Sequence, residues 1–213
     1  MKKIIEFQKE NGLTPDGKIG KKTLAAINAK IGDVTVEQLA NFMGQVDTET
    51  GEFNADTENL NYSVKGLRKT FSKYFKTDEE AKPYANNPKK IANKVYSNRM
   101  GNGDEASNEG SAFIGRGALQ LTGKDNYKAF SKVVGEDCVV EPTLVATKFF
   151  FESAKFYFDN NKLWGIASKV DDESITKLSK AINLGNANSK KTPNGLEERI
   201  ANTKKYYEIL TKK

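Results

Sequence analysis

The chain has 213 residues, of which 37% are hydrophobic and 29% charged, and its formal net charge is +6. This length allows one substantial core with room for a small appended module, and the composition is that of a folded globular protein. The sequence contains no histidine and only one cysteine, Cys138. These counts exclude an intrachain disulfide and the Ser-His and Cys-His nucleophile pairs, so acid–base chemistry must come from carboxylates.

The basic excess favours encounter with a polyanion such as nucleic acid or the bacterial wall, without choosing between them. At the N-terminus, Glu6, Gln8 and Glu10 interrupt the apolar run that a signal peptide would need. No apolar stretch approaches the roughly 20 residues that span a bilayer. We therefore expect no signal peptide and no integral membrane segment.

The first 32 residues predict two short helices joined by a turn at residues 14–17, with Leu24, Ile27 and Ile31 on one face of the second. The sequence from Phe7 to Thr23 resembles the second half of a peptidoglycan-binding module. We expect residues 1–32 to form this small segment and residues 33–213 the main domain. Two interpretations stay open, since the segment could bind the wall or only cap the main domain.

A new helix is predicted after Gly32, because Thr35 and Gln38 have the spacing of a capping box. Its apolar stripe ends with a carboxyl group, Glu49, just before Gly51. The residues of this stripe recur at helical spacing: Leu39, Phe42, Met43, Val46 and Glu49.

Further helices are predicted at about residues 89–99, 142–159, 175–185 and 196–210, so the main domain is mainly α. The alternating residues 115–123, between glycines, predict a short strand with Leu119 and Leu121 facing inward. A phosphate loop is excluded there, because the glycine spacing is one residue too long and Asp125 replaces the required hydroxyl residue.

The acidic residues 47–58 have three interpretations. Composition alone favours a solvated loop. A calcium loop is the second, with Asp47, Glu49 and Glu58 at template positions 1, 3 and 12, but Gly51 falls one position too early. The third is a glycosidase pair, in which one carboxyl is kept protonated by apolar surroundings and the other stays ionised.

Glu49 suits the acid of such a pair, because burial on the apolar stripe would disfavour its charged form and let it donate a proton. Glu58 suits the base, since its neighbours are polar: Asn59, Asn61, Tyr62 and Ser63. For an inverting enzyme, we expect the two carboxyl groups roughly 6.5 to 9.5 Å apart, which leaves room for a water.

Three ordered segments now identify a resemblance: Gln45–Phe53, Glu58–Ser63 and Gly115–Gly123 are similar to the signature segments of glycoside hydrolase family 19, the chitinase-like family that includes many phage endolysins. The likeness extends over about residues 34–210 through Asn93–Asn102, Asn183 and Arg199. One departure is Thr48, which stands where many members have histidine.

The resemblance implies a helical, lysozyme-like fold with a substrate groove and an inverting mechanism. Glu49 would be the general acid, Glu58 the general base, and Thr122 would help to hold the attacking water. Other positions are expected to bind substrate: Gln120, Asn183, Tyr62, Ser63, Tyr96, Asn126 and Arg199. No metal or organic cofactor is expected.

The sequence therefore predicts an endolysin that hydrolyses β-1,4 bonds of peptidoglycan and lyses the host cell. We expect a monomer that binds peptidoglycan and no nucleic acid, is made in the host cytoplasm and depends on a holin for release to the periplasm and wall. The alternatives are a chitinase, a bacterial wall-remodelling hydrolase and a catalytically inactive glycan-binding protein.

Overall fold

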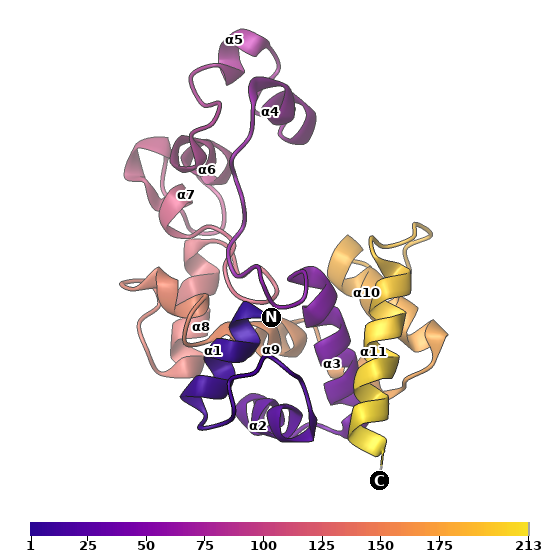
Figure 1. The fold of residues 1–213 in the computed structure, drawn as a ribbon. Helices are drawn as coiled ribbons and strands as arrows, with labels where there is room; N and C mark the ends of the chain where they lie inside the picture. Colours follow the sequence, from indigo (N-terminus) through magenta and orange to yellow (C-terminus); the bar gives the residue numbers. More distant parts are fainter. Residues whose placement is uncertain (213) are drawn as a thin grey trace. The chain divides into compact units, whose positions relative to one another are not determined.

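The computed structural model describes residues 1–212 and is mainly helical (Figure 1). Two compact units are distinguished, one formed by residues 1–56 together with the chain from Phe150 onward and the other by residues 57–149. In the described residues, no helix is both long and apolar enough to cross a membrane.

In its described part, the first unit contains six α-helices and one 3-10 helix: α1 (Lys2–Glu10), α2 (Lys21–Ile31), α3 (Val36–Glu49), α9 (Phe150–Asn160), η3 (Leu163–Ser168), α10 (Asp172–Leu184) and α11 (Leu196–Thr211). Helices α3 and α11 run side by side in Figure 1. Gly44 makes this approach close, because a Cβ there would lie 2.7 Å from the backbone nitrogen of Thr203. Any larger residue at position 44 would push the two helices apart.

Local sequence signals set the ends of α3, as predicted. The Thr35 side chain accepts from the Gln38 N–H, and the Gln38 side chain accepts from the Thr35 N–H, which completes the capping box. The four apolar residues of the stripe predicted for this helix are buried, and only its last member, Glu49, is partly exposed. After Thr50 the chain leaves the helix through Gly51, whose φ is +53°. Glu49 is therefore held at the last helical residue.

Helices α1 and α2 share the core of the first unit. Phe7 packs edge-on against Phe151 of α9 with ring centroids 5.2 Å apart, and Phe53 lies 6.2 Å from the same ring. Lys3 is buried, its N–H donates to the Phe53 carbonyl at 3.0 Å, and its ammonium pairs with Asp56 at 2.8 Å. The N-terminal segment thus packs on the loop that follows Glu49.

The second unit contains five α-helices and two 3-10 helices: α4 (Val64–Thr70), α5 (Asp78–Ala81), α6 (Pro88–Tyr96), η1 (Glu105–Ser107), α7 (Glu109–Ala112), α8 (Lys124–Val134) and η2 (Pro142–Val145). One of its core clusters joins the chain after Glu58 to α4 and α6, and consists of Leu60, Leu67, Phe75, Ala81, Ile91, Ala92 and Val95.

The strand predicted at residues 115–123 is wrong. Within the described chain, only isolated bridges form there, Thr57 with Arg116 and Arg116 with Leu121. The intervening residues make a tight turn in which Gln120 has a φ of +54°. The predicted alternation nevertheless holds, because Leu119 and Leu121 are buried while Gln120 is exposed.

The helix predicted over residues 142–159 is also broken. A 3-10 turn occupies Pro142–Val145, and α9 begins only at Phe150. Phe149 packs on Phe130 of the second unit at 6.0 Å, whereas Phe150 packs on Phe151 of the first at 5.1 Å. One apolar run therefore supplies two cores, and α9 begins where the run passes from the second unit to the first.

Candidate active site

Glu49 lies at the C-terminal end of α3 and forms an ion pair with Arg199 of α11. The Glu49 side chain is 24% exposed and that of Arg199 only 2%. The guanidinium also donates to Gln45 Oε1 at 2.7 Å through Nη1 and to the Asn194 carbonyl at 2.9 Å through Nε. A buried guanidinium with three fixed acceptors has one orientation, so it fixes the carboxylate as well.

This pair corrects the expected environment of Glu49. Continuation of the apolar stripe predicted mainly apolar surroundings, but the structure places a buried cation against Oε1. Arg199 was predicted to bind substrate. Because it is buried and bonded to Glu49 and Gln45, we assign it the positioning of these two side chains.

Asn183 of α10 connects to the same network. Its Oδ1 accepts the N–H of Asn194 at 2.9 Å, and Asn194 is the residue whose carbonyl accepts from Arg199. The Asn183 side chain is partly exposed. A residue predicted to bind substrate therefore also orders the loop that holds Arg199.

Two further side chains lie near Glu49: Tyr157, which was not predicted, and Thr48, which the sequence had singled out as a departure. The pKa of the Tyr157 hydroxyl is raised, first by burial and second by the negative charge of Glu49. The Thr48 Oγ accepts from Asn202 of α11 at 3.2 Å while donating to the Gly44 carbonyl. The departure at Thr48 therefore adds a second link between α3 and α11.

Glu58 begins the second unit, and hydrogen bonds hold both of its carboxylate oxygens. Oε1 accepts the Gly115 N–H at 2.6 Å, and Oε2 accepts the Tyr96 hydroxyl at 2.8 Å. The Glu58 N–H donates in turn to the Gly115 carbonyl at 2.9 Å. Burial and then the charge of Glu58 raise the pKa of Tyr96, which therefore stays protonated as a donor at neutral pH.

The turn at residues 115–122 brings three predicted residues together around Gly115. A Cβ at this glycine would lie 2.5 Å from Gln120 Oε1, 3.2 Å from Thr122 Oγ and 3.3 Å from Glu58 Oε1. Thr122 Oγ donates to the Gln120 carbonyl at 2.8 Å, and Asn126 Nδ2 donates to the Thr122 carbonyl at 2.8 Å. A larger residue at position 115 would therefore displace the end of the Gln120 side chain and crowd Thr122 and Glu58.

Tyr62 and Ser63 lie further along the same segment. Tyr62 packs edge-on against Phe71, with ring centroids 5.3 Å apart. Tyr62 also lies near Tyr96 and makes a small contribution to the raised pKa of the Tyr96 hydroxyl. Ser63 is the N-cap of α4, and its Oγ accepts the Gly66 N–H at 3.2 Å. The structure thus gives Ser63 a structural function as a helix cap, whereas Tyr62 belongs to the surroundings of Tyr96.

A pocket of about 300 Å³ opens beside Glu58 within the second unit. We call it the Glu58 pocket, and its lining residues are Glu58, Leu60, Pro88, Lys89, Ala92, Ser111 and Ile114. Four of them are apolar, and they surround one acidic and one basic side chain. This composition is typical of a ligand pocket, in which a few polar groups orient a largely apolar contact.

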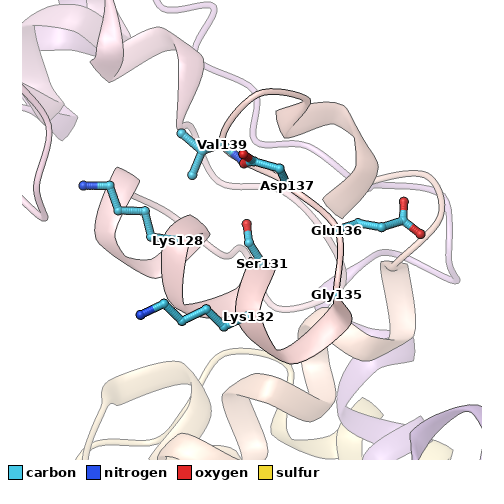
Figure 2. Close-up of a pocket in the computed structure, with 7 residues that line it drawn as sticks. All are labelled: Lys128, Ser131, Lys132, Gly135, Glu136, Asp137 and Val139. Carbon is cyan, nitrogen blue, oxygen red and sulfur yellow. The ribbon is translucent and has the colours of Figure 1, made fainter.

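Figure 2 shows a second pocket of the same unit, about 560 Å³, between the end of α8 and the loop after Gly135. Its lining side chains include Lys128 and Lys132 from the helix and Glu136 and Asp137 from the loop. It shares no lining residue with the Glu58 pocket, and no predicted site residue lines it.

The acidic stretch does not have the arrangement of a calcium loop. Asp47 and Glu49 lie in the last turn of α3, and Asp47 is buried, accepting a hydrogen bond from the Tyr206 hydroxyl. Across residues 1–212, no group of three or more acidic, histidine or cysteine side chains is placed to hold a metal ion.

Comparisons with known proteins agree with these observations. A family described as "Putative peptidoglycan binding domain" matches residues 1–27. A "Glycosyl hydrolase family 19 domain-containing protein" of Haemophilus influenzae is 40% identical over 178 residues, which cover 84% of this chain and 82% of the relative. An "Acidic 27 kDa endochitinase" of Solanum lycopersicum is 49% identical over 43 residues, 20% of this chain and 17% of its own length.

The first of these relatives shares most of its length with the chain, and the mainly helical architecture agrees with the fold that the resemblance implied. The chain belongs to glycosyl hydrolase family 19 and is a glycoside hydrolase.

Proposed function

We propose that this glycoside hydrolase cleaves β-1,4 glycosidic bonds of bacterial peptidoglycan by an inverting mechanism, with Glu49 as acid and Glu58 as base. Glu49 gives its proton to the leaving glycosidic oxygen. Glu58 takes a proton from a water that attacks the anomeric carbon from the opposite face. The bond from carbon to the leaving oxygen breaks as the bond to water forms.

The observation that carries the proposal is the pair of hydrogen bonds to Glu58. The Gly115 N–H and the Tyr96 hydroxyl fix the carboxylate without neutralising it with a cation. Such a group is oriented and remains an acceptor, as a general base requires. Thr122 Oγ, close to the same glycine, is suited to help hold the water, and Gln120 to bind the sugar.

The surroundings of Glu49 support the acid role through the position of its carboxyl group, and not through the apolar environment expected from the sequence. Arg199 engages Oε1, whereas Oε2 makes no hydrogen bond within residues 1–212. In the proposed mechanism, Oε2 is the oxygen that faces the leaving glycosidic oxygen. Arg199 and Gln45 hold the carboxyl group in place, and positioning of this kind matters because small displacements of reacting groups are costly to catalysis.

We propose that substrate contacts come from the remaining predicted residues, with Ser63 acting chiefly as a helix cap and Arg199 chiefly by positioning Glu49. Those that offer a side chain for direct binding are Gln120, Asn183, Tyr62, Tyr96 and Asn126.

Peptidoglycan is favoured as the substrate by the match of residues 1–27 to a putative peptidoglycan-binding family. We propose that residues 1–32 form a wall-binding segment attached to a catalytic part formed by residues 33–213. A second candidate function is chitin hydrolysis, and the segment shared with a plant endochitinase favours it. Both polymers have β-1,4-linked N-acetylhexosamines, so they must be distinguished by experiment.

In the cell, the proposed role is that of a phage endolysin. The enzyme would be made in the host cytoplasm, act as a monomer and reach the wall after a holin permeabilises the membrane. This part of the proposal rests on the resemblance to endolysins, and a lysis assay with and without a holin tests it.

The test of the activity is to incubate purified sacculi and, separately, chitin oligomers with the wild type, Glu49→Gln and Glu52→Gln. Mass spectrometry of the products identifies the new reducing-end sugar. We expect sacculus cleavage, a loss of about 10²- to 10⁴-fold in Glu49→Gln, and no change in Glu52→Gln, which lies exposed in the adjoining loop. Proton NMR of early products should show the α-anomer.

Other outcomes would each change the assignment. Cleavage of chitin alone would make the protein a chitinase. Binding to sacculi without cleavage of either polymer would indicate an inactive glycan-binding protein, and a β-anomeric product would indicate a retaining mechanism.

A further inference from the structure

Lys89 is the one basic side chain that lines the Glu58 pocket. It lies in the first turn of α6, directly after Pro88, and the side chain is exposed. No carboxylate in residues 1–212 pairs with it. Lys94, one turn and a half later on the same helix, is different because it pairs with Glu105 at 3.2 Å.

Helix stability does not explain a lysine at this position. The N-terminal end of a helix carries a partial positive charge, which favours acidic residues in the first turn and disfavours basic ones. The first turn of α6 has no acidic residue. The unpaired ammonium of Lys89 is thus placed against the preference of its own helix and beside a pocket.

The rest of the pocket is suited to bind a small, largely apolar substituent. Leu60, Ala92 and Ile114 supply apolar walls, and Ser111 adds a hydroxyl group that donates to the Asn108 carbonyl and can still accept a hydrogen bond. A ligand that suits this lining has methyl groups and one negative charge within reach of Lys89.

Peptidoglycan and chitin differ in such a substituent. Chitin is a neutral polymer of N-acetylglucosamine, whereas every second sugar of a peptidoglycan strand is muramic acid, which carries a lactyl ether with a methyl group. The lactyl carboxyl is free in a bare strand and is amide-linked in an intact strand to a stem peptide with its own methyl groups and carboxylates.

We propose that the Glu58 pocket binds the carboxylate-bearing substituent of muramic acid and that Lys89 pairs with its carboxylate. This inference rests on the proposed function, because it identifies which feature of the peptidoglycan strand the site recognises. Lys89 is a specificity residue in this arrangement and takes no part in proton transfer. It discriminates by giving binding energy to peptidoglycan that a neutral polymer does not receive.

The experiment pairs a change in the enzyme with a change in the substrate. Bare strands, prepared by removing stem peptides with an amidase, are compared with the same strands after conversion of the lactyl carboxylates to neutral methylamides, and with strands that keep their stems. Each is given to the wild type, Lys89→Gln and Lys90→Gln. Lys90 is the matched control, because it is an exposed lysine in the same helical turn that does not line the pocket.

On bare strands, Lys89→Gln should raise KM about fivefold, the scale of a solvent-accessible ion pair, while Lys90→Gln matches the wild type. Conversion to methylamides should raise the wild-type KM by a similar factor and leave that of Lys89→Gln unchanged, since the two changes remove the same interaction. An effect confined to stem-bearing strands would place the recognised carboxylate in the peptide.

Equal effects of Lys89→Gln on charged and methylamide strands, without any effect specific to stems, would overturn the assignment of Lys89 while leaving the proposed function intact. Failure of the wild type to cleave any of the three strands would overturn both.

Discussion

The buried guanidinium of Arg199 pairs with Glu49 at the end of α3, although 150 positions separate the two residues in the chain. The same guanidinium donates to Gln45, one helical turn before Glu49. α11 therefore fixes the side chain that we propose as the acid. Without Arg199, the Glu49 side chain at the end of α3 could adopt other rotamers.

We expect Arg199→Lys to lower kcat by at least about tenfold with little change in KM, because lysine keeps the charge but loses the fork that orients Glu49. Unfolding should become easier by about 1 to 3 kcal/mol, since Gln45 and the Asn194 carbonyl lose buried partners. Steady-state kinetics and urea unfolding measure the two effects.

The control for this variant is Arg68→Lys. Arg68 pairs with Asp78 at 2.7 Å, but both side chains are about half exposed, at 48% and 51%. Activity and stability should therefore stay near wild type. If Arg199→Lys behaved like Arg68→Lys, the positioning role would be wrong.

Gly115→Ala tests the arrangement around Glu58. The added Cβ would lie 2.5 Å from Gln120 Oε1 and close to Thr122 and Glu58, so these side chains must move. We expect kcat/KM to fall by on the order of 10²-fold, because displacements of about 1 Å in an active site can have effects of this size. Gly165→Ala is the matched control, because a Cβ there has no neighbour within 4 Å. Full activity of Gly115→Ala would separate Gln120 and Thr122 from catalysis.

Local signals in the sequence were sufficient for much of the helical structure. The capping box of Thr35 and Gln38 and the apolar stripe after it predicted α3 because each feature acts within one or two helical turns. The prediction of one helix from Pro142 to Asp159 was wrong. Apolar residues leave little polar face in this run, so the sequence has no hydrophobic periodicity that distinguishes one buried helix from two segments in two cores.

The sequence allowed us to predict which residues belong to the candidate site, but not all of the contacts between them. The three signature segments led to the prediction of Glu49, Glu58 and Thr122 as site residues, but no local pattern indicates that a buried arginine bonds to Glu49. The turn around Gln120 was taken for a strand because Leu119, Gln120, Leu121 and Thr122 alternate between apolar and polar residues, as they would in a strand. The positive φ of Gln120 has no signal in the sequence, since glutamine is rarely found there.

Asp47 should make stability depend on pH. It is buried, one of its oxygens has no hydrogen-bond partner within residues 1–212, and burial raises its pKa despite the hydrogen bond from Tyr206 and the nearby Lys205. A carboxyl with a raised pKa in the folded state binds its proton more tightly there than in the unfolded chain. Its contribution is therefore present below its unfolded pKa and is lost as the pH rises through the folded value.

Asp47→Asn should remove this contribution, because the amide keeps the shape and the Tyr206 hydrogen bond but cannot ionise. We expect the variant to be at least as stable as the wild type at pH 7, with a smaller fall in stability between about pH 4 and pH 7. Urea unfolding across this range measures both. Asp172→Asn, at a surface pair with Lys204, is the control. A variant clearly less stable than wild type at pH 7 would contradict the argument.

The last prediction separates the two interpretations of the N-terminal segment. Phe7 is 6% exposed and packs on Phe151, whereas Ile5, on the same helix, is 42% exposed. Because α1 packs in the core of the first unit, Phe7→Ala should destabilise the whole hydrolase by about 3 to 5 kcal/mol. Ile5→Ala should change stability by less than about 0.5 kcal/mol.

Urea unfolding followed by the intrinsic fluorescence of Trp164, which stacks on Phe42 in that core, reports on the hydrolase and not on the N-terminal segment alone. A lowered midpoint in Phe7→Ala would show that the segment stabilises the catalytic part, so that any wall contact it makes comes from a surface already fixed to the enzyme. An unchanged midpoint with weakened binding to sacculi would instead show an independent wall-binding segment, because only then can its core be damaged without cost to the hydrolase.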